Sequence, residues 1–318
     1  MGLYCLKRLA IAGLTLWGLS LVIFLLLALA PGNPLGEMAT NPAISEAVRE
    51  NLRRSLGLDQ PLSVRYGKWL LAVLRGDFGY SFTSRSPVLE LLLQRLPTTL
   101  WLLGSAYGLS VLMAVPLGIL AGWRPGSIGD RLINAVGLWG FSLPTFFTGL
   151  VLILIFSVQL GWFPFIYDST LTINDWSSLG QQIRQLVLPV TVLVLYQWAV
   201  LMRFTRSAVG EEKPQDYIRT AYAKGLHPLR IVLVHLLRNA LLPLVTLVSL
   251  DVPSLFTGAL VTEQIFRVPG IGALMVESIY RNDTPVVMAV TCIYASLILV
   301  FATLADLLYA WLDPRIRY

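Results

Sequence analysis

The sequence predicts an all-α protein that crosses a membrane several times. Hydrophobic residues make up 56% of its 318 residues and charged residues only 13%, whereas soluble proteins carry about 25% charged residues. The apolar residues are gathered in runs of about twenty, the length of helix that crosses a bilayer. A soluble domain of this length could not bury so much apolar surface, so we expect a polytopic membrane protein.

The first apolar run, residues 9–30, follows the basic pair Lys7 and Arg8. It ends in the small-residue sequence Ala28-Leu29-Ala30, which resembles a signal-peptide cleavage site. The run is longer than a typical signal core, so we interpret residues 1–30 as the first transmembrane segment. Five further runs bring the predicted number of spans to six: 99–122, 134–160, 186–206, 238–262 and 286–311.

Residues 31–97 form the one extended polar region. Proline and glycine punctuate it, and a helix is predicted in each of residues 45–57 and 61–75. The region contains eight lysines and arginines, but it is longer than the loops of about sixty residues to which the positive-inside rule applies. We therefore predict a small external (periplasmic) helical subdomain between spans one and two, and a membrane core formed by residues 98–318.

The shorter loops set the predicted topology. Residues 203–238 carry seven lysines and arginines, which predicts a cytoplasmic loop, whereas residues 161–185 carry only Arg184 and are expected outside. With six spans, both termini then lie in the cytoplasm. The net charge of +6 thus reflects loops that flank apolar spans, and it does not indicate binding to nucleic acid.

Motifs for catalysis are absent from the sequence. No Gly-x-x-x-x-Gly-Lys-Ser/Thr pattern occurs, so we expect the chain not to hydrolyse ATP itself. His227 and His235 have no cysteine nearby, and Cys5 and Cys292 lie near opposite ends of the sequence. These residues suggest neither a metal site nor a disulfide framework. No enzyme activity, bound cofactor or metal is expected.

The basic loop contains a predicted helical elbow, centred in residues 207–237. Four side chains recur at helical spacing and form one face: Tyr217, Ile218, Ala221 and Tyr222. Three polar side chains fall away from that face: Arg219, Thr220 and Lys224. Gly225 is placed to end this helix in a left-handed conformation, and Pro228 to begin the next one. Such an elbow is either a solvated loop or a docking element for a partner.

The elbow resembles the EAA loop of ABC importer permeases. The resemblance rests on RTAYAKG at 219–225 and NALLP at 239–243. Arg219 stands where that motif has glutamate, and the spacing from Gly225 to Ala240 is longer than in many importers. Both departures resemble the dipeptide/oligopeptide/nickel branch of the family. Further similar segments occur along the chain: LAPGNP at 29–34, GDFGYSF at 76–82, SLPTFFTG at 142–149 and LDPRIRY at 312–318.

The resemblance implies a type I ABC importer permease, a membrane subunit that forms half of a translocation pathway for peptides or a related small solute. Its implied partners are a second homologous permease subunit, two cytoplasmic ABC ATPase subunits that carry ATP and Mg, and an external substrate-binding protein. The implied location is the bacterial inner membrane. The apolar side of the elbow helix is expected to fill a groove on the ATPase. The implied coupling residues are Asp216, Tyr217, Ile218, Arg219, Thr220, Ala221, Tyr222, Ala223, Lys224 and Gly225.

Other functions remain open from the sequence. The chain could be a permease for a nickel complex or another solute within the same family, or an export or resistance-type ABC permease. An ion-coupled secondary transporter would show inverted repeats and several charges at membrane depth; no repeat is evident, and one charge lies near the middle of a predicted span.

That charge is Asp251, with Ser249 and Ser254 close by in the span 238–262. A carboxylate at membrane depth is costly and normally faces a wet cavity or a polar partner. Asp251 therefore either lines the translocation pathway or is a buried structural acid, and the sequence does not separate the two. Four prolines interrupt the predicted spans, as kinks or as breaks that line a pathway: Pro116, Pro144, Pro189 and Pro253.

Overall fold

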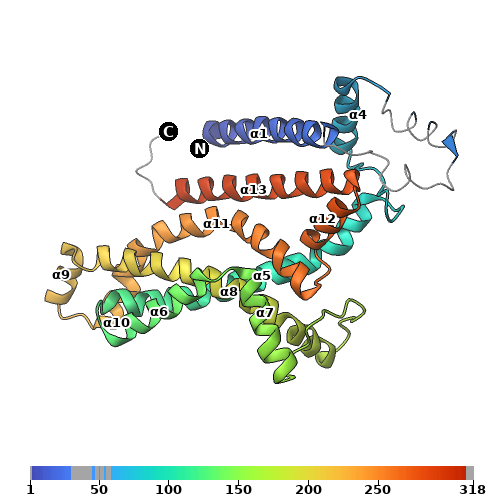
Figure 1. Ribbon diagram of the computed structural model, residues 1–318. Coiled ribbons are helices and arrows are strands. Elements are labelled where there is room, and N and C mark those ends of the chain that lie inside the picture. Colours follow the sequence, from blue (N-terminus) through green and yellow to red (C-terminus); the bar gives the residue numbers. More distant parts are fainter. Residues whose placement is uncertain (1, 30–44, 47–49, 51–53, 55–58, 313–318) are drawn as a thin grey trace. The chain divides into compact units, whose positions relative to one another are not determined.

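The computed structural model describes residues 2–29, 45–46, 50, 54 and 59–312, with side chains omitted in parts of the first helix and of the last two long helices. The described residues are helical, with one isolated bridge between Tyr80 and Pro87 and no strand (Figure 1). They divide into two compact units. Unit 1 contains Met1–Thr99 and Pro269–Val300, and unit 2 contains Leu100–Val268 and Phe301–Tyr318.

Unit 1 contains α1 (Gly2–Leu29), α4 (Leu62–Leu74), α12 (Ile271–Tyr280) and the first parts of α5 (Val88–Trp123) and α13 (Thr284–Leu312). α4 confirms the helix predicted within residues 61–75. Most of the helix predicted at 45–57 lies outside the described residues. The core of the unit joins α5, α12 and α13 through these buried side chains: Val88, Leu92, Ile271, Leu274, Val286, Ala289 and Val290.

A buried carboxylate fixes the loop before α5 in unit 1. Asp283, 1% exposed, lies in the turn between α12 and α13. It accepts hydrogen bonds from the Ser81 hydroxyl and from the backbone N–H groups of Phe82 and Thr83. Because these donors satisfy a charge that burial would otherwise make costly, the GDFGYSF segment is held firmly to the α12–α13 turn.

Unit 2 is built around α8 (Trp176–Glu212). It also contains α6 (Ile128–Ser142), α7 (Thr145–Leu152), its π-helical continuation η1 (Ile153–Gln159), α9 (Asp216–Ala223), α10 (Pro228–Arg230), the π-helix η2 (Ile231–Leu236) and α11 (Leu237–Phe266). α6 and α11 both pack along α8. Sixteen side chains of α8 are buried, among them Gln197, Trp198 and Met202.

Glycines bring the neighbours of α8 unusually close. A Cβ atom added at Gly122 of α5 would lie 2.7 Å from the carbonyl oxygen of Arg206. One added at Gly140 of α6 would lie 2.5 Å from the carbonyl oxygen of Leu195. Small residues at such crossings let backbones approach in membrane proteins, where packing rather than the hydrophobic effect holds helices together.

Four of the predicted spans are found as long apolar helices: 9–30, 99–122, 186–206 and 286–311. The other two differ from the prediction, because the span 134–160 is bent and the span 238–262 is matched only at its end, by a bent pair that extends beyond it (Gly258–Phe266 with Ile271–Tyr280). Four described helices are long and apolar enough to cross a membrane, and counting each bent pair of helices as one span brings the number up to six. The predicted span 134–160 is not one straight helix, because α6 ends at Ser142 and α7 begins at Thr145 with a bend of 102°.

The cause of this bend is Pro144. It forces the preceding residue out of the helical region, and Leu143 is extended, with φ −89° and ψ 132°. The other three prolines named above, Pro116, Pro189 and Pro253, lie inside continuous helices.

Candidate functional site

The predicted elbow helix is α9, and its end has the predicted conformation. Gly225 has a positive φ of 73°. Its N–H bonds to the carbonyl of Tyr222, and the N–H of Leu226 bonds to the carbonyl of Ala221. This pair of bonds is the Schellman motif, which satisfies the last carbonyl groups of a helix and requires a left-handed residue.

The apolar face of α9 is buried within the chain itself. Ile218 is 1% exposed and Ala221 4% exposed. They pack with side chains from α8, η2 and α11: Val209, Ile231, Leu236 and Ala240. The sequence predicts that Tyr217, Ile218 and Tyr222 fill a groove on a partner. That expectation is wrong for Ile218, because the chain's own core surrounds this side chain.

Tyr217 of α9 is partly buried against the same core, and its hydroxyl makes a polar contact there. Its hydroxyl donates to Glu212 Oε2 at 2.5 Å, at the end of α8. Burial, reinforced by the bond to Glu212, raises the pKa of Tyr217 above its usual value, so the phenol remains a hydrogen-bond donor at neutral pH. The contact ties the first turn of α9 to the last turn of α8.

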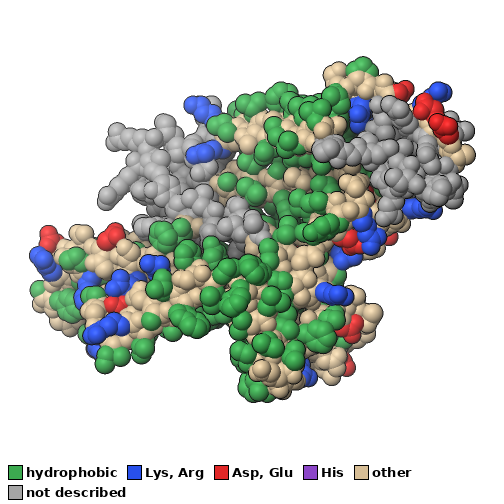
Figure 2. Space-filling view, in the orientation of Figure 1, with side chains coloured by type: hydrophobic (Ala, Val, Ile, Leu, Met, Phe, Trp, Pro, Cys, Tyr) green, Lys and Arg blue, Asp and Glu red, His purple; other side chains and the backbone are tan. Residues whose placement is uncertain are grey.

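The outward side of α9 is polar and small. Five exposed residues are polar or small, namely Asp216, Arg219, Thr220, Ala223 and Lys224, and Tyr222 is exposed beside them. Charged side chains gather over α9 and α10 at one end of this unit, whereas hydrophobic side chains cover much of the helix surface behind them (Figure 2). A partner docking on α9 would meet this polar surface.

Tyr222 connects α9 to the end of α5. Its ring stacks on Trp123, with centroids 6.4 Å apart and planes at 25°. Lys213 also contacts Trp123: its Nζ donates to the Trp123 carbonyl at 2.6 Å and lies 5.2 Å from the ring centroid, within range of a cation–π interaction. Trp123 is the last residue of α5, so α9 rests on the point where α5 turns toward α6.

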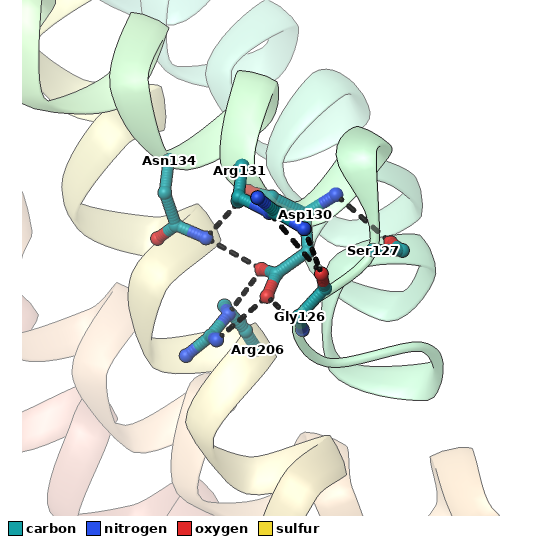
Figure 3. Close-up of polar contacts among 6 residues, drawn as sticks. All are labelled: Gly126, Ser127, Asp130, Arg131, Asn134 and Arg206. Carbon is teal, nitrogen blue, oxygen red and sulfur yellow. Dashed lines mark hydrogen bonds and ion pairs between the residues drawn. The ribbon is translucent and has the colours of Figure 1, made fainter.

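A buried carboxylate fixes the other side of that turn (Figure 3). Asp130, 4% exposed, lies in the first turn of α6, whose N-cap is Ser127. Arg206 of α8 donates two hydrogen bonds to it, from Nε at 2.6 Å and from Nη2 at 2.9 Å. The N–H of Gly126 and the amide of Asn134 donate to the same carboxylate at 2.8 and 2.6 Å.

Together these contacts hold the α5–α6 turn at both ends. We call Trp123, Asp130, Arg206 and Lys213 the elbow clamp, because Arg206 and Lys213 belong to the end of α8 and bind the two sides of the turn. α9 stacks on the clamp through Tyr222. α9 is thereby in contact with the end of α5, which the clamp joins to α6 and α8.

The sequence reasoning missed the elbow clamp. Asp130 and Arg206 are 76 positions apart, and no local pattern pairs residues at that distance. One signal was available: Ser127 precedes Asp130 by three positions, which is the spacing of a helix N-cap with an acid in the first turn. It predicts the start of α6, but not the partner of Asp130.

The predicted pathway residues Ser249, Asp251 and Ser254 lie on α11. Their side chains are outside the described part of the structure, so their interactions stay predictions. In the described residues, no group of three His, Cys, Asp or Glu side chains is placed to hold a metal ion.

Comparison with known proteins identifies the class first. The fold matches the inward-facing MetNI methionine ABC transporter, with a TM-score of 0.56 and 18% identity over 71% of this chain and 97% of that one. This likeness confirms the predicted fold, that of a type I ABC importer permease.

The sequence comparisons then give the family. Residues 114–318 match the "Binding-protein-dependent transport system inner membrane component" family, and residues 1–103 match its N-terminal region. The oligopeptide transport system permease protein AppB of Bacillus subtilis is 41% identical over 100% of both chains. The di/tripeptide transport system permease protein DppB of Pseudomonas aeruginosa is 37% identical over 98% of both. The chain therefore belongs to this family of multi-pass inner-membrane permease subunits.

Proposed function

We propose that this chain forms half of the translocation pathway of an ABC importer that takes up peptides delivered by an external binding protein. The peptide substrate is supported by the relatives that match this chain from end to end, which are named as oligopeptide and di/tripeptide permeases. Delivery by a binding protein is supported by the description of the family as binding-protein-dependent. The partners in this proposal are a second homologous permease subunit, two ABC ATPases that carry ATP and Mg, and the binding protein.

The observation that carries the coupling role is the position of α9. Its apolar face is part of the core of the chain, and its polar face is exposed. A force applied to the exposed face of such a helix moves it together with the core to which its apolar face is bound. We infer that closure of the ATPases on ATP moves α9 as a unit with the elbow clamp, and that α5, α6 and α8 carry this movement into the membrane.

The exposed residues of α9 suggest how an ATPase would recognise it. Asp216 and Arg219 form an exposed pair, with the Arg219 Nη1 atom 3.4 Å from Asp216 Oδ1. Such a surface pair contributes about 0–1 kcal/mol to stability, so both groups remain available to a partner. In this proposal the charged side of α9 sets the register of docking, and Tyr222, 46% exposed, supplies apolar contact at its edge.

The proposed orientation follows from the charge of the loops. The elbow loop, residues 203–238, and both termini lie in the cytoplasm, where the ATPases are, and residues 31–97 lie on the outer side, where a binding protein could reach them. Arg203, Arg206 and Arg238 flank the spans on the cytoplasmic side in this topology.

Reconstitution tests the proposal. The chain is purified together with its partner permease, ATPases and binding protein, and inserted into proteoliposomes that contain ATP. We expect the binding protein to carry a peptide, identified by mass spectrometry, and the vesicles to accumulate that peptide when ATP is present. A matched preparation with a hydrolysis-deficient ATPase is the control. Accumulation of a nickel complex in place of peptide, or efflux in place of uptake, would contradict the proposed substrate or direction.

A further inference from the structure

Helix α4 of unit 1 uses an aromatic face to pack on α1. The Tyr66 hydroxyl lies 2.8 Å from the hydroxyl of Ser20, and the rings of Tyr66 and Trp69 lie 5.4 and 5.9 Å from that of Phe24. The Arg65 guanidinium lies over the same phenylalanine ring, 6.0 Å from its centroid. Phe24 is 6% exposed as a result. α4 therefore has a defined position along α1.

That position lies within the depth of the membrane. α1 is long and apolar enough to cross a membrane with the stretch Leu6–Leu29. At a rise of about 1.5 Å per residue this stretch is about 36 Å long, a few ångströms longer than a hydrocarbon layer of about 30 Å. Ser20 lies about 14 Å of helix before Leu29, and Phe24 about 8 Å. Because α4 touches both residues, it meets α1 below the level at which the hydrocarbon layer ends.

The side of α4 away from α1 carries exposed leucines. Leu71 is 56% exposed and Leu74 74% exposed. The end of α1 beside it is also apolar and exposed, with Leu26 at 67% and Leu29 at 71%. α4 and the end of α1 thus both carry exposed apolar side chains.

The charges of α4 are all basic. Arg65 and Lys68 lie within the helix, Arg75 caps its C-terminus, and no acidic residue lies between Leu62 and Leu74. Leu71 lies on the same face of α4 as Lys68 and Arg75, which are three positions before it and four after it, and Tyr66 and Trp69 lie on the face that packs on α1. The long apolar stems of the basic side chains let their charged ends reach headgroups beside an inserted leucine, which suits a helix at the membrane interface.

We propose that α4 is an interfacial helix bound to phospholipid, in the leaflet at the C-terminal end of α1. Leu71 and Leu74 insert among the acyl chains, and Lys68 and Arg75 contact headgroup phosphates. The region that composition alone describes as an external polar subdomain then begins at the membrane surface, and α4 holds the segment that leads into α5 against it. This inference does not depend on the transported substrate or on the coupling role of α9.

Fluorescence quenching in nanodiscs tests the proposal. The full transporter, with Cys5 and Cys292 replaced, carries one cysteine at a time at Leu71, Leu74 or Lys68, labelled with bimane. The nanodiscs contain phosphatidylethanolamine and phosphatidylglycerol, with or without bromine on the acyl chains. Leu14→Cys, on the 67% exposed position of α1, is the lipid-facing reference, and Thr83→Cys, in the exposed loop before α5, is the water-facing one. Nanodiscs expose both membrane surfaces, so the result does not depend on topology.

We expect brominated lipid to quench the labels at Leu71 and Leu74 about as strongly as the label at Leu14, and to leave the label at Thr83 unaffected. Before bimane labelling, a polar maleimide should modify Lys68→Cys much faster than the two leucine positions on the same helix. Rapid modification of Leu71→Cys and Leu74→Cys without quenching would place this face in water. Slow modification without quenching would place it against protein. Either result overturns the proposal, and because both leucines are exposed, their replacement by cysteine leaves no cavity that could unfold the chain.

Discussion

Arg206 grips Asp130 with two of its guanidinium nitrogens, across the junction between the end of α8 and the start of α6. The carboxylate is buried, whereas the arginine side chain is 36% exposed. The bidentate geometry fixes direction as well as distance, which a lysine cannot do. The pair is thus suited to hold two helices in one orientation while both move.

We predict that Arg206→Lys lowers uptake per ATP hydrolysed while the complex still assembles. Lysine keeps the charge near Asp130 but cannot donate two bonds in a fixed direction. The orientation of α6 relative to α8 is then less firmly held. Uptake and ATP hydrolysis are measured on the same proteoliposomes. An exposed arginine of the same helix provides the matched control, since Arg203→Lys should leave both the α6–α8 junction and the α9 surface unchanged. An unchanged ratio in Arg206→Lys would contradict the role of the clamp.

Asp130→Asn and Arg206→Gln should be strongly non-additive. Asp130→Asn removes the negative charge and replaces one of the two oxygens that accept from Arg206, Gly126 and Asn134 with an NH2 donor. A hydrogen bond to a charged group contributes about 1.5–3 kcal/mol, and the loss is smaller here because Arg206 is partly solvated. The double variant should lose little more thermal stability than Asp130→Asn alone, because the shared interaction is already gone. Melting temperatures of the four purified complexes check this, and simple addition of the two effects would show that the residues act independently.

Gly225→Val should impair assembly with the ATPase or ATP-dependent uptake. No heavy atom lies within 4 Å of a Cβ built at Gly225, so the effect comes from the backbone alone. A β-branched residue held at a φ of 73° is strained by about 1–3 kcal/mol. Gly225→Asn is the matched control, because asparagine tolerates this conformation. The measurements are copurification of the ATPase and uptake, and Gly225→Val behaving like Gly225→Asn would refute the prediction.

Cysteine labelling in intact cells checks the proposed orientation. A cysteine at Ser45, which is exposed, should react with an impermeant maleimide, whereas one at Lys224 on the exposed side of the elbow should react only after the cells are opened. Lys224 is a better reporter than Lys213, whose ammonium is bonded to Trp123. The reverse pattern would invert the topology and separate α9 from any cytoplasmic ATPase.

Asp251→Asn tests whether α11 contributes to the translocation pathway. If Asp251 lines the pathway, as we propose, the variant should assemble and support ATP binding normally while uptake falls or changes its substrate preference. If Asp251 is a structural acid, the yield of folded complex should fall instead, because its polar partner loses a charged hydrogen bond. Yield and uptake are compared on one preparation. Low yield with normal uptake per assembled complex would refute the pathway role.

Local features of this fold were predictable from the sequence, and distant pairings were not. The positive φ of Gly225 and the helix start at Pro228 follow from the chemistry of single residues, and the structure confirms both. The sequence identified Pro144 as a kink or a break, but it could not predict the bend of 102° between α6 and α7. The use of Ile218 in the chain's own core depends on η2 and α11, which only the fold brings to α9.

The length of α8 connects two distant parts of unit 2. This helix is continuous and about 55 Å long. Near the start of α8, two hydrogen bonds fix the preceding loop: the Gln182 amide donates to the Tyr167 hydroxyl, and the Asp168 N–H donates to Gln185. Near its end, α8 is bonded to α9 through Glu212 and Tyr217. α6 crosses α8 most closely at Gly140, where a Cβ atom would lie 2.5 Å from the carbonyl oxygen of Leu195. If α8 tilts as a rigid body about this crossing, we expect its two ends to move in opposite directions, so that one helix links the loop at residues 167–168 to α9.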